Sequence, residues 1–600
     1  MPTLQHAPET RLPSTAARLT SWLVGSVGVA IPVILFLAVW SYYAVNVPKW
    51  DDHALRAFLY SFDQEKTISG KVYQLFKQHN EHRIVLDRFV ALLDFKVLGK
   101  LDYRHLMAVG NLSLVGLLLV FISVLRREGR SIAYAIPPAL LIFNLSHWEN
   151  MFWGMAALQN FSVVLWVVLS IYWLTYENRW RWAIVTAILA TLTSGNGLIV
   201  WPIGLALILL NANNSSSVES AKATKQSRIL PVAGWFVSAI LVLGLYFADY
   251  AKPEGNPPLR GSAVDLLKGW LAFIGAAAEA LPVKSALPAC IALGGLLVVS
   301  TLGLMGWQLV INRLAVSRAL RGLVNPRMAG SGKGIPTSTL FFWGCAAFVL
   351  GTAAVVAWTR TGFGLDLIIT SRYKIYSLTL LALLYLSVAT AVNKPAGRWV
   401  MIGGLAGSFL FAWFAYFTFL DDSIWFRHWQ TTNQFNWTYT QQEPTAEIDS
   451  LTLHYTDPAP AFYDSILPAL YGPAEKSLIP VTVAKAPYGY MVQTGASAMA
   501  SLSVDQSFGR DAGTYLLARS PERSYLFPVW QNQRTPRQAR FWPGNIFTTG
   551  FKADIWQSAL KAGTYQLFVV TISAGNQCTV YPTSQLITSA GQPKDIKKNW

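Results

Sequence analysis

Polar residues that can do chemistry gather in a few short clusters, and each cluster lies at the end of a long apolar run. The clusters are Trp50-Asp51-Asp52-His53, Asn80-Glu81-His82-Arg83, His147-Trp148-Glu149-Asn150 and Ser371-Arg372-Tyr373-Lys374. Ionisable side chains at membrane depth are costly and are usually kept for function. If the clusters meet in the folded chain, they therefore predict one site that holds both carboxylates and cations.

The acidic pair Asp51 and Asp52 directly follows the first apolar run and comes after Trp50, a residue type that favours the membrane interface. A carboxylate held at that depth can act as a general base and remove a proton from a hydroxyl group. The second carboxylate can share the proton or bind a cation. The alternative interpretation is that both are ordinary interfacial charges.

The basic residues predict a phosphate site. A guanidinium group matches the oxygens of a phosphate and stabilises the charge of a phosphate that departs. The candidates for phosphate binding are Arg372, Lys374, Arg360 and Arg83. Cations that extend from lipid-facing helices towards the headgroups are the alternative interpretation.

The remaining polar side chains of the clusters can hold hydroxyl groups, as a sugar requires. These candidates are His53, Glu81, His82, His147, Glu149, Asn150 and Gln159. Trp148 and Trp153 have flat rings that can stack on a sugar. The alternatives are buried interfacial histidines and an aromatic belt with polar contacts to headgroups.

The elements that must position these residues are membrane spans. Of the 600 residues, 53% are hydrophobic and only 13% are charged, and apolar runs of bilayer length recur along the chain. The predicted spans are 21–45, 105–125, 131–147, 157–175, 182–194, 197–212, 230–250, 286–311, 337–358, 375–393 and 398–420. The pair 182–194 and 197–212 is short, so it is either two spans or one broken, re-entrant element.

Lysine and arginine in the loops predict the orientation, because cytoplasmic loops are enriched in both. With residues 1–20 in the cytoplasm, every second loop is basic. Those loops contain Arg126, Arg127 and Arg130; Arg179 and Arg181; Lys222, Lys225 and Arg228; Arg313, Arg318, Arg321, Arg327 and Lys333; and Lys394 and Arg398. All the polar clusters then lie on the opposite, periplasmic side, together with the C-terminus.

The net charge of +17 does not indicate nucleic-acid binding. Residues from Asp421 onward include 14 basic and 13 acidic side chains, so the positive excess lies before that point, where the basic loops account for it. The three cysteines form no disulfide framework, and no His/Cys cluster predicts zinc. The acidic pair is also a candidate ligand for a divalent cation, and the sequence leaves the identity of any metal open.

The domain organisation follows from composition. Residues 21–420 form the membrane domain, with a large first periplasmic loop at 46–104 in which 52–62 and 83–98 have the spacing of surface helices. A surface helix is also expected near 264–282. Residues 421–477 form a connecting segment. Residues 478–600 contain short β-type runs that alternate with turn residues, which predicts a small β-sandwich. The expected strands are 479–483, 489–493, 500–504, 514–518, 547–551, 565–572 and 578–581.

Taken together, these features resemble the GT-C superfamily of integral membrane glycosyltransferases. The resemblance covers the architecture of residues 20–420, with Asp51 and Asp52 at the family's acidic position and Ser371-Arg372-Tyr373 resembling an outer Arg-Tyr motif. The β-domain resembles the carbohydrate-binding-like domains of some members. The resemblance implies a polyprenyl-phosphate sugar as the donor and no other certain cofactor.

We therefore expect a multi-pass enzyme of the bacterial inner membrane, with a polytopic α-helical domain of about eleven spans followed by a periplasmic β-sandwich. It would transfer a sugar to a glycan or other periplasmic acceptor, with inversion and an aspartate base. The alternatives are an O-antigen polymerase or ligase, and a non-enzymatic glycolipid transporter or polysaccharide-assembly scaffold. The particular sugar, the acceptor and the oligomeric state do not follow from the sequence.

Overall fold

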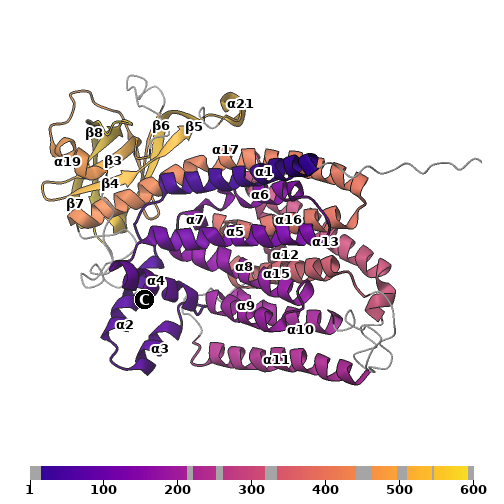
Figure 1. Ribbon diagram of the computed structural model, residues 1–600. Helices are drawn as coiled ribbons and strands as arrows, with labels where there is room; N and C mark the ends of the chain where they lie inside the picture. Colours follow the sequence, from indigo (N-terminus) through magenta and orange to yellow (C-terminus); the bar gives the residue numbers. More distant parts are fainter. Residues whose placement is uncertain are drawn as a thin grey trace, which may run out of the picture.

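The computed structural model describes residues 15–211, 221–251, 261–317, 334–440, 462–495, 510–542 and 546–591. A bundle of roughly parallel helices carries a β-sandwich at one end, which we call the sandwich end (Figure 1). The predicted strand 500–504, the start of the loop at 251–285 and most of the basic loop 313–333 lie outside the described residues.

Eight helices of the described chain are long and apolar enough to cross a membrane. They are α1 (Thr15–Tyr43), α5 (Tyr103–Arg127), α8 (Gly154–Thr175), α11 (Ala221–Phe247), α13 (Ala286–Ile311), α15 (Thr337–Arg360), α16 (Lys374–Ala391) and α17 (Lys394–Thr440). Helices α5 and α8 are the most closely packed pair, and α8 is mostly buried. This is the architecture of a multi-pass membrane protein.

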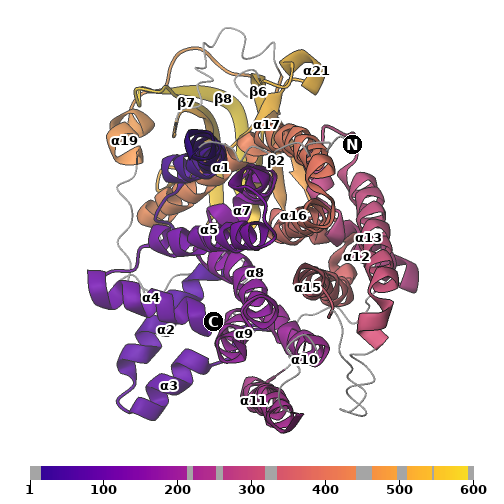
Figure 2. The same ribbon diagram turned by 45° about the vertical axis from the view of Figure 1, so that its right-hand side comes forward.

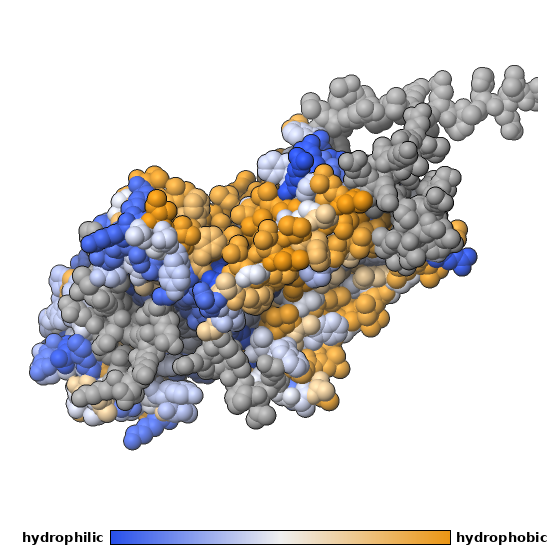
Figure 3. Space-filling view, turned by 90° about the horizontal axis from the view of Figure 1, so that it is seen from below, coloured by the Kyte–Doolittle hydropathy of each residue, from blue (hydrophilic) through white to orange (hydrophobic). Residues whose placement is uncertain are grey.

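The outer surface of the bundle is apolar, as contact with lipid requires. Helix α11 packs against α9 and α10 at the edge of the bundle (Figure 2). It exposes large side chains such as Phe236, Ile240, Leu241 and Leu245. Figure 3 shows a broad apolar band on this side of the molecule, with hydrophilic surface concentrated towards the sandwich end. Such a continuous apolar surface is far larger than soluble proteins expose.

Three of the predicted spans are not single long helices. The chain at 131–147 forms η1 (Ile132–Ala135), α6 (Ile136–Ile142) and η2 (Leu145–His147). Two prolines at the start of α6 have no N–H to continue a preceding helix, and Asn144 accepts from the Ser146 N–H to begin η2. The pair at 182–212 is α9 (Trp180–Thr193), η3 (Gly195–Ile199) and α10 (Val200–Asn211), so the predicted break between them is confirmed.

The basic loops meet at the end opposite the sandwich. The Arg130 guanidinium donates to the carbonyl of Val392, and Arg127 pairs with Glu177. Residues from three of the predicted basic loops are therefore neighbours there. The compartment that each end faces remains a prediction from the charge pattern.

At the sandwich end, the first loop forms α2 (Asp52–Gln64), α3 (Ile68–Phe76) and α4 (Val85–Leu98), of which the predicted helices 52–62 and 83–98 are confirmed. The expected surface helix near 264–282 is α12 (Ala263–Ile274) followed by η4 (Ala276–Ala280). Only its first half lies at the surface, because its second half is buried, and the helix packs against α13 and α15. The short elements η6 (Thr361–Phe363), η7 (Leu365–Ile368) and η8 (Ser371–Tyr373) connect α15 to α16.

Helix α17 is longer than predicted. The expected span ended at residue 420, but the helix continues to Thr440, so its 47 residues extend roughly 70 Å, more than twice a bilayer core. Its last part replaces the first third of the expected connecting segment, which resumes as α19 (Tyr463–Tyr471). Asn436 donates to the carbonyl of Leu526 and accepts from its N–H at 2.9 and 2.7 Å. The helix thereby joins the β-domain directly.

The β-domain is a sandwich of two four-stranded antiparallel sheets, ordered β1-β2-β6-β5 and β4-β3-β7-β8. The strands are β1 (Thr482–Ala486), β2 (Gly489–Thr494), β3 (Gly513–Arg519), β4 (Ser524–Pro528), β5 (Trp530–Gln533), β6 (Phe547–Trp556), β7 (Gly563–Ile572) and β8 (Cys578–Ser589). Val492, Leu516, Phe551 and Leu567 pack between the sheets. The predicted sandwich is confirmed, whereas β4 and β5 were not anticipated. The short helix α21 (Pro536–Ala539) follows β5.

Candidate active site at the sandwich end of the helix bundle

The two aspartates of the acidic pair lie in different environments. Trp50 adopts a positive φ of 40°, which is uncommon for a residue other than glycine, and the chain turns there into α2. Asp52 is fully buried, and its two carboxylate oxygens accept the N–H groups of Lys49 and Met155 at 3.0 and 2.9 Å. Burial raises the pKa of Asp52 to about 7. Asp52 thus joins the first loop to the start of α8.

Asp51, in contrast, has 39% of its side chain exposed and reaches the site. Its carboxylate lies 3.9 Å from the Nε2 of His79 and within electrostatic range of Arg372 and His82. Burial lowers the pKa of both histidines, so each favours the neutral form. Of the two carboxylates, Asp51 is the one that a substrate can contact.

Arg372 faces a glutamate and an aromatic ring. Its Nε lies 3.5 Å from the carboxylate of Glu149, and its guanidinium carbon lies 5.4 Å from the ring centre of Trp153. About a third of its side chain, 32%, remains exposed. The guanidinium is therefore oriented by the protein and still open to a ligand.

Glu149 also pairs with Lys49, at 2.8 Å between Nζ and Oε1. Lys49 is 4% exposed and lies over the rings of Trp50, Trp153 and Phe426, at 4.2 to 4.5 Å. Burial raises the pKa of Glu149, but the two cations outweigh burial and hold it below its ordinary value. The carboxylate thus stays ionised between Lys49 and Arg372.

Hydrogen bonds to the backbone join the segment at 146–150 to Ser371 and Arg372, although the two segments are more than 200 residues apart in the sequence. The Ser371 hydroxyl donates to the Ser146 carbonyl at 3.0 Å and accepts from the Glu149 N–H at 3.1 Å. The Asn150 side chain donates to the carbonyl of Arg372 at 2.9 Å. Two of the predicted clusters, at 147–150 and 371–374, are therefore one structural unit.

A second arginine completes the basic side of the site. Arg360 pairs with Glu81 at 2.7 Å, with 32% and 23% of the two side chains exposed. His82, next to Glu81, accepts the N–H of Gly195 at 3.1 Å. The amide of Asn196 donates to the hydroxyl of Tyr376 on α16 at 2.7 Å. The turn between α9 and α10 therefore lies at the same end as the polar clusters.

Lys374 belongs to a neighbouring cavity of about 400 Å³, which Glu149, Glu279, Asp366, Ser371 and Asp422 also line. It is 1% exposed, pairs with Glu279 at 2.5 Å and lies over the ring of Phe419. Lys374 is therefore buried and paired with a carboxylate, whereas the sequence predicted that it binds a phosphate. Glu279 and Lys49 are polar partners that the sequence analysis missed, and the position of Lys49 beside Trp50 was the available signal.

Several predicted residues lie away from the group. The Arg83 guanidinium donates to the carbonyls of Phe76, Tyr246 and Ala248, so it fastens the first loop to the end of α11. His53 contacts Arg56 within α2. His147 is fully buried between Phe36 and Phe161. Gln159 is half-buried on α8, next to Asn160, which donates to Asn150.

The described residues do not form a metal centre: within them, no group of three or more His, Cys, Asp or Glu side chains is placed to hold an ion. Both oxygens of Asp52 already accept N–H groups, which leaves Asp51 as the exposed carboxylate of the acidic pair.

No protein-family model matches this sequence, and no curated protein or solved structure matches it either. The group offers the exposed carboxylate of Asp51, and two partly exposed guanidinium groups that each lie beside a glutamate, at the end of a lipid-facing helix bundle.

Proposed function

We propose that this protein is an integral membrane glycosyltransferase of the GT-C type that uses a polyprenyl-phosphate sugar as its donor. The single observation that carries the proposal is the gathering of Asp51, Arg372 and Arg360 at one end of the bundle, from segments more than 300 residues apart. A donor of this kind has a lipid tail that fits the apolar bundle surface and an anionic phosphate at the depth of its polar end.

In the proposed step, an acceptor hydroxyl attacks the anomeric carbon of the donor sugar. The new bond forms between the acceptor oxygen and that carbon, while the bond from the carbon to the phosphate oxygen breaks. The proton of the hydroxyl moves to the Asp51 carboxylate. The leaving group departs as polyprenyl phosphate, and Arg372 and Arg360 stabilise its charge. A single displacement of this kind inverts the anomeric centre.

The environment of each residue supports its role. Asp51 is exposed enough to contact a hydroxyl, whereas Asp52 is occupied by two backbone N–H groups and acts as a positioning residue. Glu149 and Trp153 restrict Arg372, so its planar group meets a phosphate with little loss of side-chain freedom. Glu81 holds Arg360 in the same way.

The test is transfer of a labelled sugar from extracted polyprenyl-linked donor by the full-length protein in detergent. Asp51→Asn keeps the size of the side chain but cannot accept the proton, so turnover should fall by about 10² to 10⁴ while donor binding changes little. Arg372→Lys keeps the charge and loses the fork, so donor affinity and turnover should fall together.

Matched controls are available outside the site. Asp63→Asn lies further along α2, where Asp63 pairs with Lys96 at the surface, and Arg104→Lys alters an exposed pair with Asp102. Both should retain wild-type turnover. If Asp51→Asn and Arg372→Lys also retain it at equal thermal stability, the assigned centre is wrong. Absence of transfer from every polyprenyl-linked donor would favour a transporter or scaffold.

A further inference from the structure

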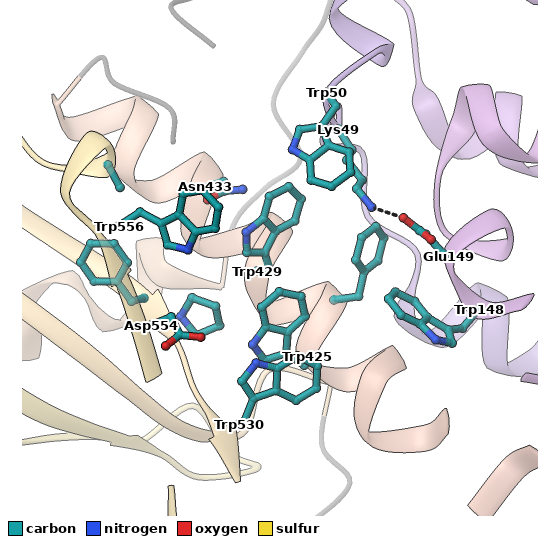
Figure 4. A pocket seen from close by; sticks show the side chains of 14 residues that line it. Lys49, Trp50, Trp148, Glu149, Trp425, Trp429, Asn433, Trp530, Asp554 and Trp556 are labelled. Atoms are coloured by element: carbon teal, nitrogen blue, oxygen red, sulfur yellow. Dashed lines mark hydrogen bonds and ion pairs between the residues drawn. The ribbon is translucent and has the colours of Figure 1, made fainter. Parts of the chain in front are cut away.

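A cleft of about 420 Å³ separates the helix bundle from the β-sandwich (Figure 4). Its walls come from the end of α17, from the sandwich and from two segments of the candidate active site, at Lys49-Trp50 and Trp148-Glu149. This volume falls within the range of small-molecule sites. Tryptophans dominate the lining: Trp50, Trp148, Trp425, Trp429, Trp530 and Trp556.

The rings are arranged as flat platforms. Trp425 of α17 and Trp530 of β5 stack with centres 4.3 Å apart and planes inclined by 8°. Trp556, at the end of β6, stacks on Tyr488 at 5.4 Å and 15°, and both rings are more than half exposed. Trp556 is thus a largely exposed indole in the lining of the cleft.

Polar groups stand between these platforms. Figure 4 shows Asp554 and Asn433 among the rings on one side, and the Lys49–Glu149 pair on the other. Since Lys49 and Glu149 compensate each other at 2.8 Å, the Asp554 carboxylate leaves the lining with a net negative charge. Because Lys49 is already paired with Glu149, the lining gives a phosphate no free cation, whereas Asp554 is an acceptor for hydroxyl groups.

Sugars have the matching chemistry, because a pyranose or furanose ring has apolar C–H faces and a rim of hydroxyl groups. Flat aromatic faces with a few polar groups at their edges fit this pattern. We infer that the cleft is a binding site for a neutral glycan chain. Its place beside Glu149, which also contacts Arg372, makes that glycan the acceptor. The acceptor role rests on the proposed function, whereas glycan binding does not.

Binding is measured by calorimetry with the full-length protein in detergent, using a panel of neutral hexasaccharides of glucose, mannose, galactose, rhamnose and arabinose. At least one should bind. Trp556→Ala and Asp554→Asn change exposed side chains and should each raise Kd about tenfold or more, equivalent to about 1.4 kcal/mol. Trp530→Ala should have a larger effect. Trp542→Ala, an exposed tryptophan outside the cleft, is the matched control and should bind like wild type.

The possible outcomes separate this inference from the proposed function. If no hexasaccharide of the panel binds, or if Trp556→Ala and Asp554→Asn both bind as wild type, the inference is overturned. If undecaprenyl phosphate binds instead, and Trp556→Ala weakens it, the occupant is a lipid and the inference also fails. Glycan binding without any sugar transfer would retain the site and reject the transferase. With transfer established, an unchanged acceptor KM in Trp556→Ala would reject the acceptor role.

Discussion

The buried aspartate of the acidic pair gives the sharpest physical prediction, because the stability lost on removing it should be larger at low pH than at high pH. Asp52→Ala deletes the acceptor of two buried N–H groups, those of Lys49 and Met155. Leaving each unpaired costs about 1–3 kcal/mol, so a loss of about 2–6 kcal/mol is expected where the carboxyl is neutral.

The ionised carboxylate adds a second effect of opposite sign. Folding raises the pKa of Asp52 from 3.8 to about 7, so the folded protein keeps a proton that the unfolded chain has released. The stability that this provides is fully present below about pH 4 and is lost as the pH rises to about 7. The loss between pH 5 and pH 8 is about 2–3 kcal/mol by this linkage. Asp52→Ala has no such carboxyl group, so its stability does not fall in this way. The difference in unfolding free energy between wild type and Asp52→Ala should therefore be about 2–3 kcal/mol smaller at pH 8 than at pH 5.

The assay is reversible unfolding in mixed detergent micelles at both pH values, followed by tryptophan fluorescence, since buried tryptophans such as Trp153 and Trp235 become exposed on unfolding. Asp51→Ala, at the exposed neighbour, should stay within about 0.5 kcal/mol of wild type at both pH values. Equal deficits of Asp52→Ala at pH 5 and pH 8 would refute the raised pKa and the burial behind it.

Three further predictions concern contacts that hold the site. Glu149→Gln should destabilise the protein by about 3–5 kcal/mol, because it leaves Lys49 buried without its anion. In a double-mutant cycle, adding Lys49→Met should restore most of the lost unfolding free energy. Arg427→Ala removes two contacts to Asp511 at 2.8 and 3.1 Å that link α17 to the sandwich, so limited proteolysis should release the domain faster than in wild type. Gly197→Ala places a methyl group 2.1 Å from a carbonyl oxygen of α9. The detergent-solubilised variant should lose more thermal stability than a Gly295→Ala control, whose added methyl group meets no atom within 4 Å.

Much of the architecture could be read from the residues in order, because each feature involves a local signal. Length and hydropathy of a run are sufficient to indicate a helix such as α5 or α8, and alternation with turn residues indicated most strands of the sandwich. The break between α9 and α10 followed from the shortness of the runs 182–194 and 197–212. The run 131–147 was misjudged because hydropathy averages over the two prolines at the start of α6, which separate that helix from η1.

The extent of α17 could not be predicted in this way. Its segment after residue 420 is polar and aromatic, which resembles a loop, but several of its buried polar side chains contact the sandwich and others contact the end of α1 and the residues after it. Asn436 continues the hydrogen bonding of β4, and Arg427 reaches both Asp511 and the end of α1. These partners lie far away along the chain, so no local pattern records them.

The sequence by itself determined which residue types were available at the ends of the apolar runs: the aspartate pair, the arginines, and the polar cluster at 147–150. Only the tertiary structure decided their roles. It buried Asp52 against two N–H groups and left Asp51 exposed, paired Arg83 with carbonyls, and brought Glu149 between Lys49 and Arg372. The physical reason is that burial and partner geometry set the charge and accessibility of a side chain, and both depend on segments hundreds of residues away.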